Sequence, residues 1–365
     1  VLEAIERLAR DQNDGATVKL TLERRLSRTA DAAVRAALLE RLGNAFAWQL
    51  ADPVGAARAW LEGAEISERL PAELERARRL YERVLSVDAG SAKAAGRLVE
   101  LSAQAGDWEQ VREAFEVVLP TLEERHLVTL LLSLEERAET TGAAPAYVEL
   151  IDLGLARGLH PGRARHLGLA KARALSSIAG GANEAAKLFR SLVQTAGDEA
   201  AHELESFADF LQRAEQSPER IADYRWMMAE SVKRASSPIE LWLKWAEVEE
   251  QRFQEPERAG ALLEQVVAAD PERTDALFEL SRLRAAAGDA KGAAAALREL
   301  LPRADAESRP AIQLKLASIL ISSLGEPEAA LELAESVLSK QASDADALRI
   351  VHQALGAPQT RTRAA

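Results

Sequence analysis

A glycine recurs along this chain at a nearly constant interval. Gly106 and Gly142 are 36 positions apart, Gly142 and Gly180 are 38 apart, and Gly288 and Gly325 are 37 apart. A period between about 20 and 50 residues is typical of a solenoid, in which each repeat packs only on its neighbours. We therefore expect a repeat array, although 365 residues would otherwise suggest two or three domains.

The segments between these glycines have helical periodicity, because leucines and alanines recur three or four positions apart. Three segments begin at a proline, namely Pro53, Pro256 and Pro327. Proline is preferred at the first position of a helix, where its missing N–H leaves no hydrogen bond unmade. Asp52 is expected to cap the first of these helices, and the glutamates before the other two prolines are poorer caps. The recurring acidic residue and proline thus predict the start of a helix, the second of the two helices in each repeat, and not a catalytic acid.

The composition limits the classes of function. Aromatic residues make up only 4% of the chain, so its apolar content is mostly Ala, Leu and Val. A net charge of -12 argues against binding to duplex nucleic acid, which needs clustered Lys and Arg. The absence of cysteine excludes disulfides and thiolate metal sites. Usage rich in Ala and Arg and poor in Lys predicts a GC-rich, bacterial genome.

No segment has the length and apolar content of a membrane span, and the first residues do not resemble a signal peptide. We expect a cytoplasmic protein, and the periplasm stays open because residue 1 is Val and not Met.

Positions five, nine and twelve after the glycine are small or apolar in several units. They are Ala293, Leu297 and Leu300 after Gly288, and Ala330, Ala334 and Val337 after Gly325. In this pattern the chain resembles the tetratricopeptide repeat (TPR) superfamily, whose unit is a helix-turn-helix of about 34 residues. The resemblance implies an all-α, right-handed superhelical solenoid of about nine to ten stacked antiparallel helix pairs.

The expected organisation is one solenoid over residues 1–356, followed by a disordered tail at 357–365. The stretch around 69–90 is expected to be irregular, because ARRLYERVLSVD resembles a second helix that has no first helix of its own. The array is expected to end in a short single helix, Asp344 to Leu355.

The resemblance also implies a partner site, because TPR proteins mostly bind peptides or proteins on the concave face lined by first helices. In the three proline-marked units the fifth position of the first helix is basic: Arg41, Lys244 and Lys315. Four positions later the family's carboxylate-binding members have Asn, which this chain lacks. We predict that an acidic, partly apolar peptide binds Arg41, Trp48, Lys244, Val248, Lys315 and Ile319. The alternative is that these charges are solvated or form local salt bridges, such as Lys244 with Glu240.

No pattern in the sequence indicates catalysis or a cofactor. The five histidines are scattered, and phosphate-binding, metalloprotease and nucleophile-elbow motifs are absent. We therefore predict a non-enzymatic scaffold that binds a peptide or protein, without a cofactor or metal.

Two other functions stay open. The chain is a candidate regulatory or sensor segment of a larger enzyme or secretion machine. It is also a candidate RNA-processing scaffold, because Trp242 and Trp245 with Ala246 and Glu249 resemble the first helix of the HAT repeat. The simpler interpretation of these tryptophans is that they fill the seam between stacked helix pairs.

Overall fold

The structure is a computed structural model that describes residues 1–356, so the predicted disordered tail at 357–365 lies outside the described residues. Residues 1–356 form helices, turns and no strand, which confirms the predicted all-α fold. The described chain divides into two compact units, Val1–Ala214 and a second that begins at Glu215. None of their helices is long and apolar enough to cross a bilayer.

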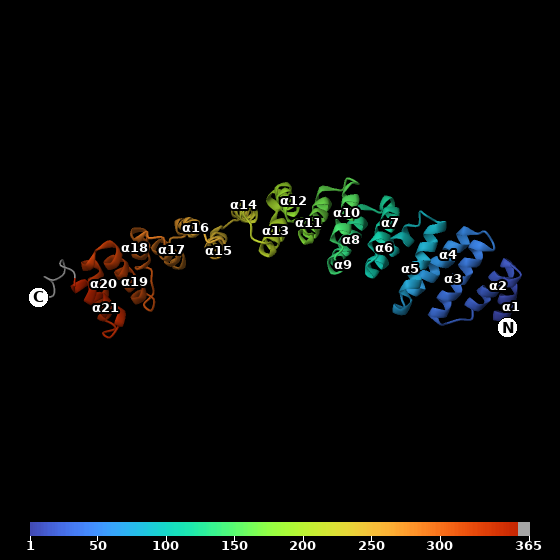
Figure 1. Cartoon of the computed structure of the whole chain (residues 1–365), viewed down its shortest axis with the longest axis horizontal. Coiled ribbons are helices and arrows are strands. Elements are labelled where there is room, and N and C mark those ends of the chain that lie inside the picture. Colours follow the sequence, from blue (N-terminus) through green and yellow to red (C-terminus); the bar gives the residue numbers. More distant parts are fainter. Residues whose placement is uncertain (357–365) are drawn as a thin grey trace. The chain divides into compact units, whose positions relative to one another are not determined.

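The first unit holds thirteen α-helices (Figure 1). They are α1 (Leu2–Asp11), α2 (Gly15–Leu26), α3 (Ala32–Trp48), α4 (Pro53–Glu68), α5 (Leu74–Val87), α6 (Ala92–Ala105), α7 (Trp108–Val118), α8 (Glu124–Ser133), α9 (Glu135–Thr141), α10 (Ala144–Leu155), α11 (Pro161–Ser177), α12 (Ala182–Ala196) and α13 (Ala201–Arg213). Three single-turn 3₁₀ helices lie between them, at Pro71–Glu73, Leu119–Thr121 and Gly197–Glu199.

The second unit continues the same alternation of helices and short turns. Its helices are α14 (Pro218–Arg234), α15 (Ile239–Gln251), α16 (Pro256–Ala269), α17 (Thr274–Ala286), α18 (Ala290–Leu300), α19 (Arg309–Ile319), α20 (Pro327–Leu338) and α21 (Ala345–Leu355). A π-helical turn at Leu320–Leu324 extends α19. The short helix expected at the C-terminal end is α21, which confirms that prediction.

The local signals at the helix ends act as predicted. Pro53, Pro256 and Pro327 are the first residues of α4, α16 and α20. Asp52 caps α4, since its Oδ1 accepts a hydrogen bond from the Gly55 N–H at 2.8 Å. The glutamates before the other two prolines make no such bond.

The periodic glycines end the first helices of their pairs. Gly106, Gly142, Gly288 and Gly325 have φ values of 76°, 69°, 81° and 66°. This left-handed conformation is costly for a residue with a Cβ atom and is common just after a helix. The glycines therefore turn the chain back so that consecutive helices pack side by side.

Within the first unit, ion pairs join a helix to the second helix after it along the chain. Glu40 of α3 pairs with Arg83 of α5 at 3.0 Å, and Arg78 of α5 pairs with Asp107, the cap of α7, at 3.3 Å. On the other side, Glu68 of α4 pairs with Arg97 of α6. Helices α3, α5 and α7 thus form one row, and α4 and α6 belong to another.

This arrangement differs from the order of first and second helices predicted by the prolines and the periodic glycines. Pro53 predicts that α3 is a first helix and Gly106 predicts that α7 is a second helix, yet the structure places both in the same row. The cause is α5, a single helix inserted between two pairs at the stretch predicted to be irregular, 69–90. Because one extra helix reverses the alternation, helices before and after α5 exchange rows. A second irregularity leaves the order of the rows unchanged. Helices α8 and α9 both contact α11 and together occupy the place of one helix.

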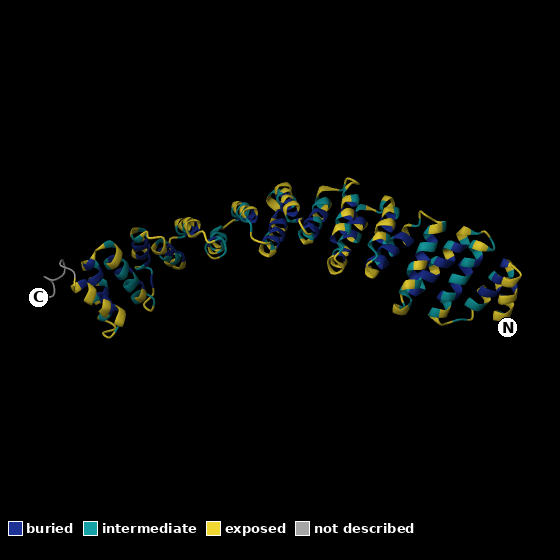
Figure 2. Ribbon diagram, in the orientation of Figure 1, coloured by how far each residue is buried: buried dark blue, intermediate teal, exposed yellow. Residues whose placement is uncertain are grey.

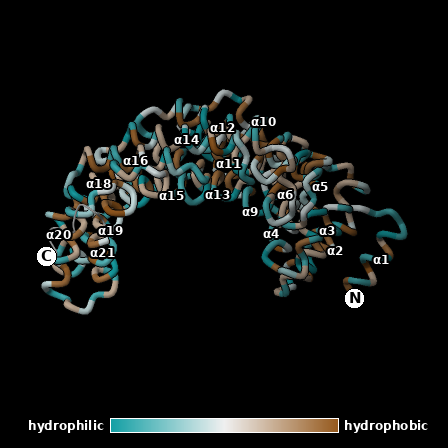
Figure 3. The backbone as a smooth tube through the Cα atoms, turned by 60° about the vertical axis from the view of Figure 1, so that its left-hand side comes forward, coloured by the Kyte–Doolittle hydropathy of each residue, from teal (hydrophilic) through white to brown (hydrophobic). Residues whose placement is uncertain are grey.

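The buried residues lie where neighbouring helices face each other, and the exposed residues lie on the outward surfaces of the helices (Figure 2). Hydrophobic and hydrophilic residues accordingly alternate along the backbone (Figure 3). The core of α12 and α13 is aromatic, with the ring centroids of Phe189 and Phe207 5.1 Å apart. Trp242 and Trp245 pack against the core of α15, α16 and α17, which agrees with their predicted role in a seam.

All three tyrosines of the chain are buried. Tyr81 and Tyr147 have 0% exposure and Tyr224 has 5%. The hydroxyl of Tyr81 donates to Glu68 Oε2 and that of Tyr147 donates to the Leu131 carbonyl, both at 2.9 Å. Burial raises the pKa of Tyr81 and of Tyr224 to about 12, and it also raises the pKa of Tyr147. Burial thus favours the neutral phenols in the folded state.

This burial predicts how the protein responds to alkaline pH. The folded pKa values lie above the unfolded value of about 10, so the tyrosines contribute stability below pH 10 that is lost as the pH rises from about 10 to 12. We expect tyrosinate absorbance to appear together with the loss of helical circular dichroism. Parallel absorbance and dichroism titrations check this. Tyrosine ionisation near pH 10 with unchanged dichroism would contradict it.

Candidate functional site

Two of the predicted binding residues, Arg41 and Trp48, line the same hollow in the first unit. Its volume is about 430 Å³ and it lies between α1, α2 and α3, whose places are shown in Figure 1. The hollow is lined by Arg10, Asn13, Val18, Leu22, Arg41, Asn44, Ala45, Trp48 and Gln49. Two cations, three amides, an aromatic ring and apolar side chains therefore meet in one place.

The two arginines are held by a buried carboxylate. Glu6 of α1 has 0% exposure, and its Oε1 accepts a hydrogen bond from Arg10 Nη2 at 2.7 Å and another from Arg41. Its Oε2 accepts from Arg25 Nη1 at 2.6 Å, and Arg25 also pairs with Glu3 at 2.6 Å. Three guanidinium groups thus face two carboxylates, so the cluster keeps a net positive charge.

The environment of Arg41 is unfavourable for its charge, although an arginine stays protonated in proteins. Burial lowers the pKa of Arg41, the charge of Glu6 opposes this change, and the charges of Arg10 and Arg25 add to the lowering. The side chains of Arg41 and Arg10 remain 40% and 51% exposed. An additional anion in the hollow would relieve the repulsion between them.

The remaining lining gives the hollow an apolar and a hydrogen-bonding part. Trp48 is 70% exposed, and the guanidinium of Arg83 lies 5.9 Å from its ring centroid. Val18 and Leu22 are buried beneath the hollow. Within residues 1–356, Gln49 Oε1 is buried and has no hydrogen-bond partner. A peptide N–H in the hollow would satisfy this acceptor.

The absence of carboxylates from this lining sets it apart from three other hollows of the described structure. One in the first unit includes Glu135 and Glu139. One in the second unit includes Glu332, and another includes Asp275, Glu279 and Asp305. In a chain with a net charge of -12, a hollow with two arginines and no acid in its lining favours an anionic occupant.

The other predicted residues lie in the second unit, on α15 and α19. Lys244 is exposed and Val248 is half-buried on α15, and Lys315 and Ile319 are half-buried on α19. The salt bridge considered for Lys244 is not formed, because Glu240 pairs instead with Arg273 at 2.7 Å. Arg41 thus belongs to the first unit, and Lys244 and Lys315 belong to the second.

Lys315 has a specific contact. Its Nζ lies 4.2 Å from the ring centroid of Phe278 of α17, a cation–π distance. Phe278 also lines a hollow of about 410 Å³ that includes three carboxylates. An acidic peptide would meet repulsion there, so the hollow of Arg10 and Arg41 suits the predicted ligand better.

The sequence interpretation missed Arg10, Asn13 and Gln49. A signal for Arg10 was present, because Glu6 and Arg10 are four residues apart and Glu6 is three residues before Ala9 on the helix face that packs inward. A charged residue on a buried face needs a partner. No comparable signal exists for Asn13 or Gln49.

No protein-family model and no curated protein matches the sequence. The C-terminal part of a TPR repeat-containing protein from Cytophaga hutchinsonii is similar, with 9% identity, a TM-score of 0.32, and coverage of 81% of this chain and 98% of that one.

Two further solved structures are similar over much of the chain. A tetratricopeptide repeat protein from Parabacteroides merdae has 16% identity, a TM-score of 0.30, and coverage of 77% of this chain and 96% of that one. The assembly chaperone of RpL4, Acl4, has 16% identity, a TM-score of 0.25, and coverage of 75% and 99%. Each TM-score is below 0.5, so neither fold nor function is inferred from these likenesses.

The chain's own helices define its class. Paired helices of about a dozen residues, with a left-handed glycine inside several pairs and most helices in contact with the next, make this an all-α helical-repeat protein.

Proposed function

We propose that this chain is a non-enzymatic scaffold that binds a protein partner through an acidic, partly apolar segment. The observation that carries the proposal is the hollow of α1, α2 and α3, where Arg10 and Arg41 lie beside the exposed ring of Trp48 and no carboxylate lines the wall. A carboxylate of the partner would pair with the arginines, and an apolar side chain would pack on Trp48. Lys244, Val248, Lys315 and Ile319 remain a second predicted contact region for the same partner.

Binding of synthetic peptides tests the proposal. The probe is a fluorescein-labelled peptide in which glutamates alternate with leucine and phenylalanine, and the comparison peptide has glutamine in place of each glutamate. We expect the acidic peptide to bind and its affinity to fall as salt is raised. Trp48→Ala is expected to weaken binding about 30-fold and Arg41→Gln about tenfold, since buried aromatic and arginine anchors dominate interfaces.

Arg28→Gln is the matched control, because Arg28 is an exposed arginine just after α2 and does not line the hollow. Trp48 is largely exposed, so its removal is expected to leave the fold intact, and circular dichroism of each variant checks this. Equal binding of both peptides, or equal loss in Trp48→Ala and Arg28→Gln, would refute the hollow as the site. The double variant Lys244→Glu and Lys315→Glu separately tests the second unit.

A further inference from the structure

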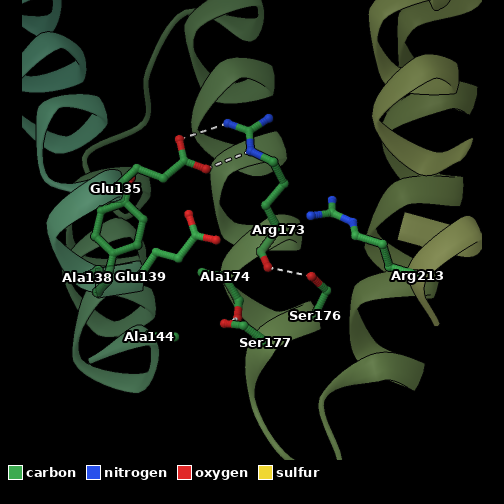
Figure 4. Close-up of a pocket in the computed structure, with 10 residues that line it drawn as sticks. Glu135, Ala138, Glu139, Ala144, Arg173, Ala174, Ser176, Ser177 and Arg213 are labelled. Carbon is green, nitrogen blue, oxygen red and sulfur yellow. Dashed lines mark hydrogen bonds and ion pairs between the residues drawn. The ribbon is translucent and has the colours of Figure 1, made fainter. Parts of the chain in front are cut away.

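A second hollow of the first unit combines two opposite charges, Glu139 and Arg213, that form no ion pair within the described residues. Its volume is about 120 Å³, and α9, α10, α11 and α13 contribute its walls. Glu139 of α9 and Arg213 of α13 project toward each other from opposite sides (Figure 4). Among the described residues the Glu139 carboxylate forms no ion pair, and the Arg213 side chain only donates from Nε to the Asp209 carbonyl at 3.2 Å.

The other charged and phenolic groups that line the hollow already have hydrogen-bond partners. Arg173 donates from Nε and Nη2 to the two carboxylate oxygens of Glu135 at 2.6 and 2.8 Å. This hydrogen bonding raises the pKa of Arg173, so its charge is committed to Glu135. The hydroxyl of Tyr147, behind the pair, is bonded to the Leu131 carbonyl. The pair holds α9 against α11 and leaves Arg213 as the cation available to a ligand.

Two hydroxyl groups complete the lining. Ser176 Oγ donates to the Arg173 carbonyl at 2.6 Å and Ser177 Oγ donates to the Ala174 carbonyl at 2.8 Å. Since each hydroxyl proton is used within α11, the hydroxyl oxygens can only accept from a ligand. The hollow therefore offers a carboxylate and two hydroxyl acceptors for a donor cation, and a guanidinium for an anion.

We propose that this hollow binds a small zwitterion, namely a free α-amino acid with a short side chain. Its carboxylate pairs with the Arg213 guanidinium, and its ammonium group, which has three donors, bonds to Glu139 and a serine oxygen. The hollow is small, at about 120 Å³, which favours an amino acid with a short side chain, such as glycine or alanine.

Binding of glycine to the full chain, followed by amide chemical shifts or calorimetry, tests the proposal. We expect saturable binding of glycine and of L-alanine. Acetate and methylammonium each carry only one of the two charges, so each is expected to bind at least about tenfold more weakly. Glu139→Gln and Arg213→Gln are each expected to weaken glycine binding about tenfold for the same reason.

The matched controls are Glu136→Gln and Arg137→Gln, exposed charges on α9 that do not line the hollow. They are expected to leave glycine binding unchanged. The proposal is overturned if glycine does not bind, if acetate binds as strongly as glycine, or if the control variants weaken binding as much as Glu139→Gln does. The result is independent of the peptide assay, because no peptide is present and none of these residues touches the hollow of Arg10 and Arg41.

Discussion

Replacing Glu249 with alanine is expected to lower the free energy of unfolding of the second unit by about 3 kcal/mol. Glu249 of α15 is 1% exposed and is the meeting point of two elements. Arg225 of α14 donates to its two carboxylate oxygens at 2.8 and 2.6 Å, and Trp245 Nε1 donates to Oε1 at 2.9 Å. Hydrogen bonding to Glu249 raises the pKa of Arg225, so the arginine carries its charge into this site.

The physical reason for a large loss is the group that remains after the substitution. Without Glu249, the guanidinium of Arg225 and the indole N–H of Trp245 lose their acceptors in a poorly hydrated position. The side chain of Arg225 is still 23% exposed and can regain some hydration. The expected loss of stability therefore lies at the lower end of the range for a broken buried ion pair. The alanine also removes packing between α14 and α15.

Urea denaturation followed by circular dichroism measures the effect, and Glu247→Ala is the matched control. Glu247 lies on the same helix two residues earlier and is exposed. Its removal is expected to change stability by no more than about 0.5 kcal/mol. Equal losses in the two variants would show that the buried contacts of Glu249 contribute little.

Replacing Gly43 with alanine is expected to destabilise the first unit by about 2 kcal/mol. Gly43 of α3 is buried against Trp60 of α4, which is itself 2% exposed. A Cβ atom at Gly43 would overlap the Cδ1 and Nε1 atoms of the indole ring. The ring cannot move freely, because Nε1 donates to Asn44 Oδ1 at 3.1 Å and to the Glu40 carbonyl at 3.3 Å.

Gly96→Ala provides the matched control, because Gly96 is also inside a helix, α6, and no atom lies within 4 Å of its added Cβ. Alanine is a better helix former than glycine, so this variant is expected to gain up to about 1 kcal/mol. The difference between the two glycines, measured by urea denaturation, isolates the close approach of α3 and α4. A gain of stability in both variants would contradict the proposed close packing at Trp60.

Some features of this protein follow from short-range properties of the chain. Proline at the first position of α4, the cap by Asp52, and the left-handed glycine at Gly106 depend on backbone conformation within a few residues. For this reason most helix ends and the all-α fold were predictable from the sequence.

The candidate sites required the tertiary structure, because they join residues from helices that are distant along the chain. The ion pair of Arg41 with buried Glu6 links α1 and α3, and the facing charges of Glu139 and Arg213 link α9 and α13. Periodicity shows that a residue is on a helix face, but it does not show which helix covers that face.

The sequence by itself determined the helical repeat, its period and most helix boundaries, because caps, prolines and glycines act locally. Only the tertiary structure decided the rows of helices and the partners of each charge. A single inserted helix, α5, exchanges the rows on its two sides, and Arg41 of α3 pairs with Glu6 of α1, which lies 35 positions earlier in the chain. The contacts of a side chain are long-range properties of the packed helices, and both candidate sites depend on them.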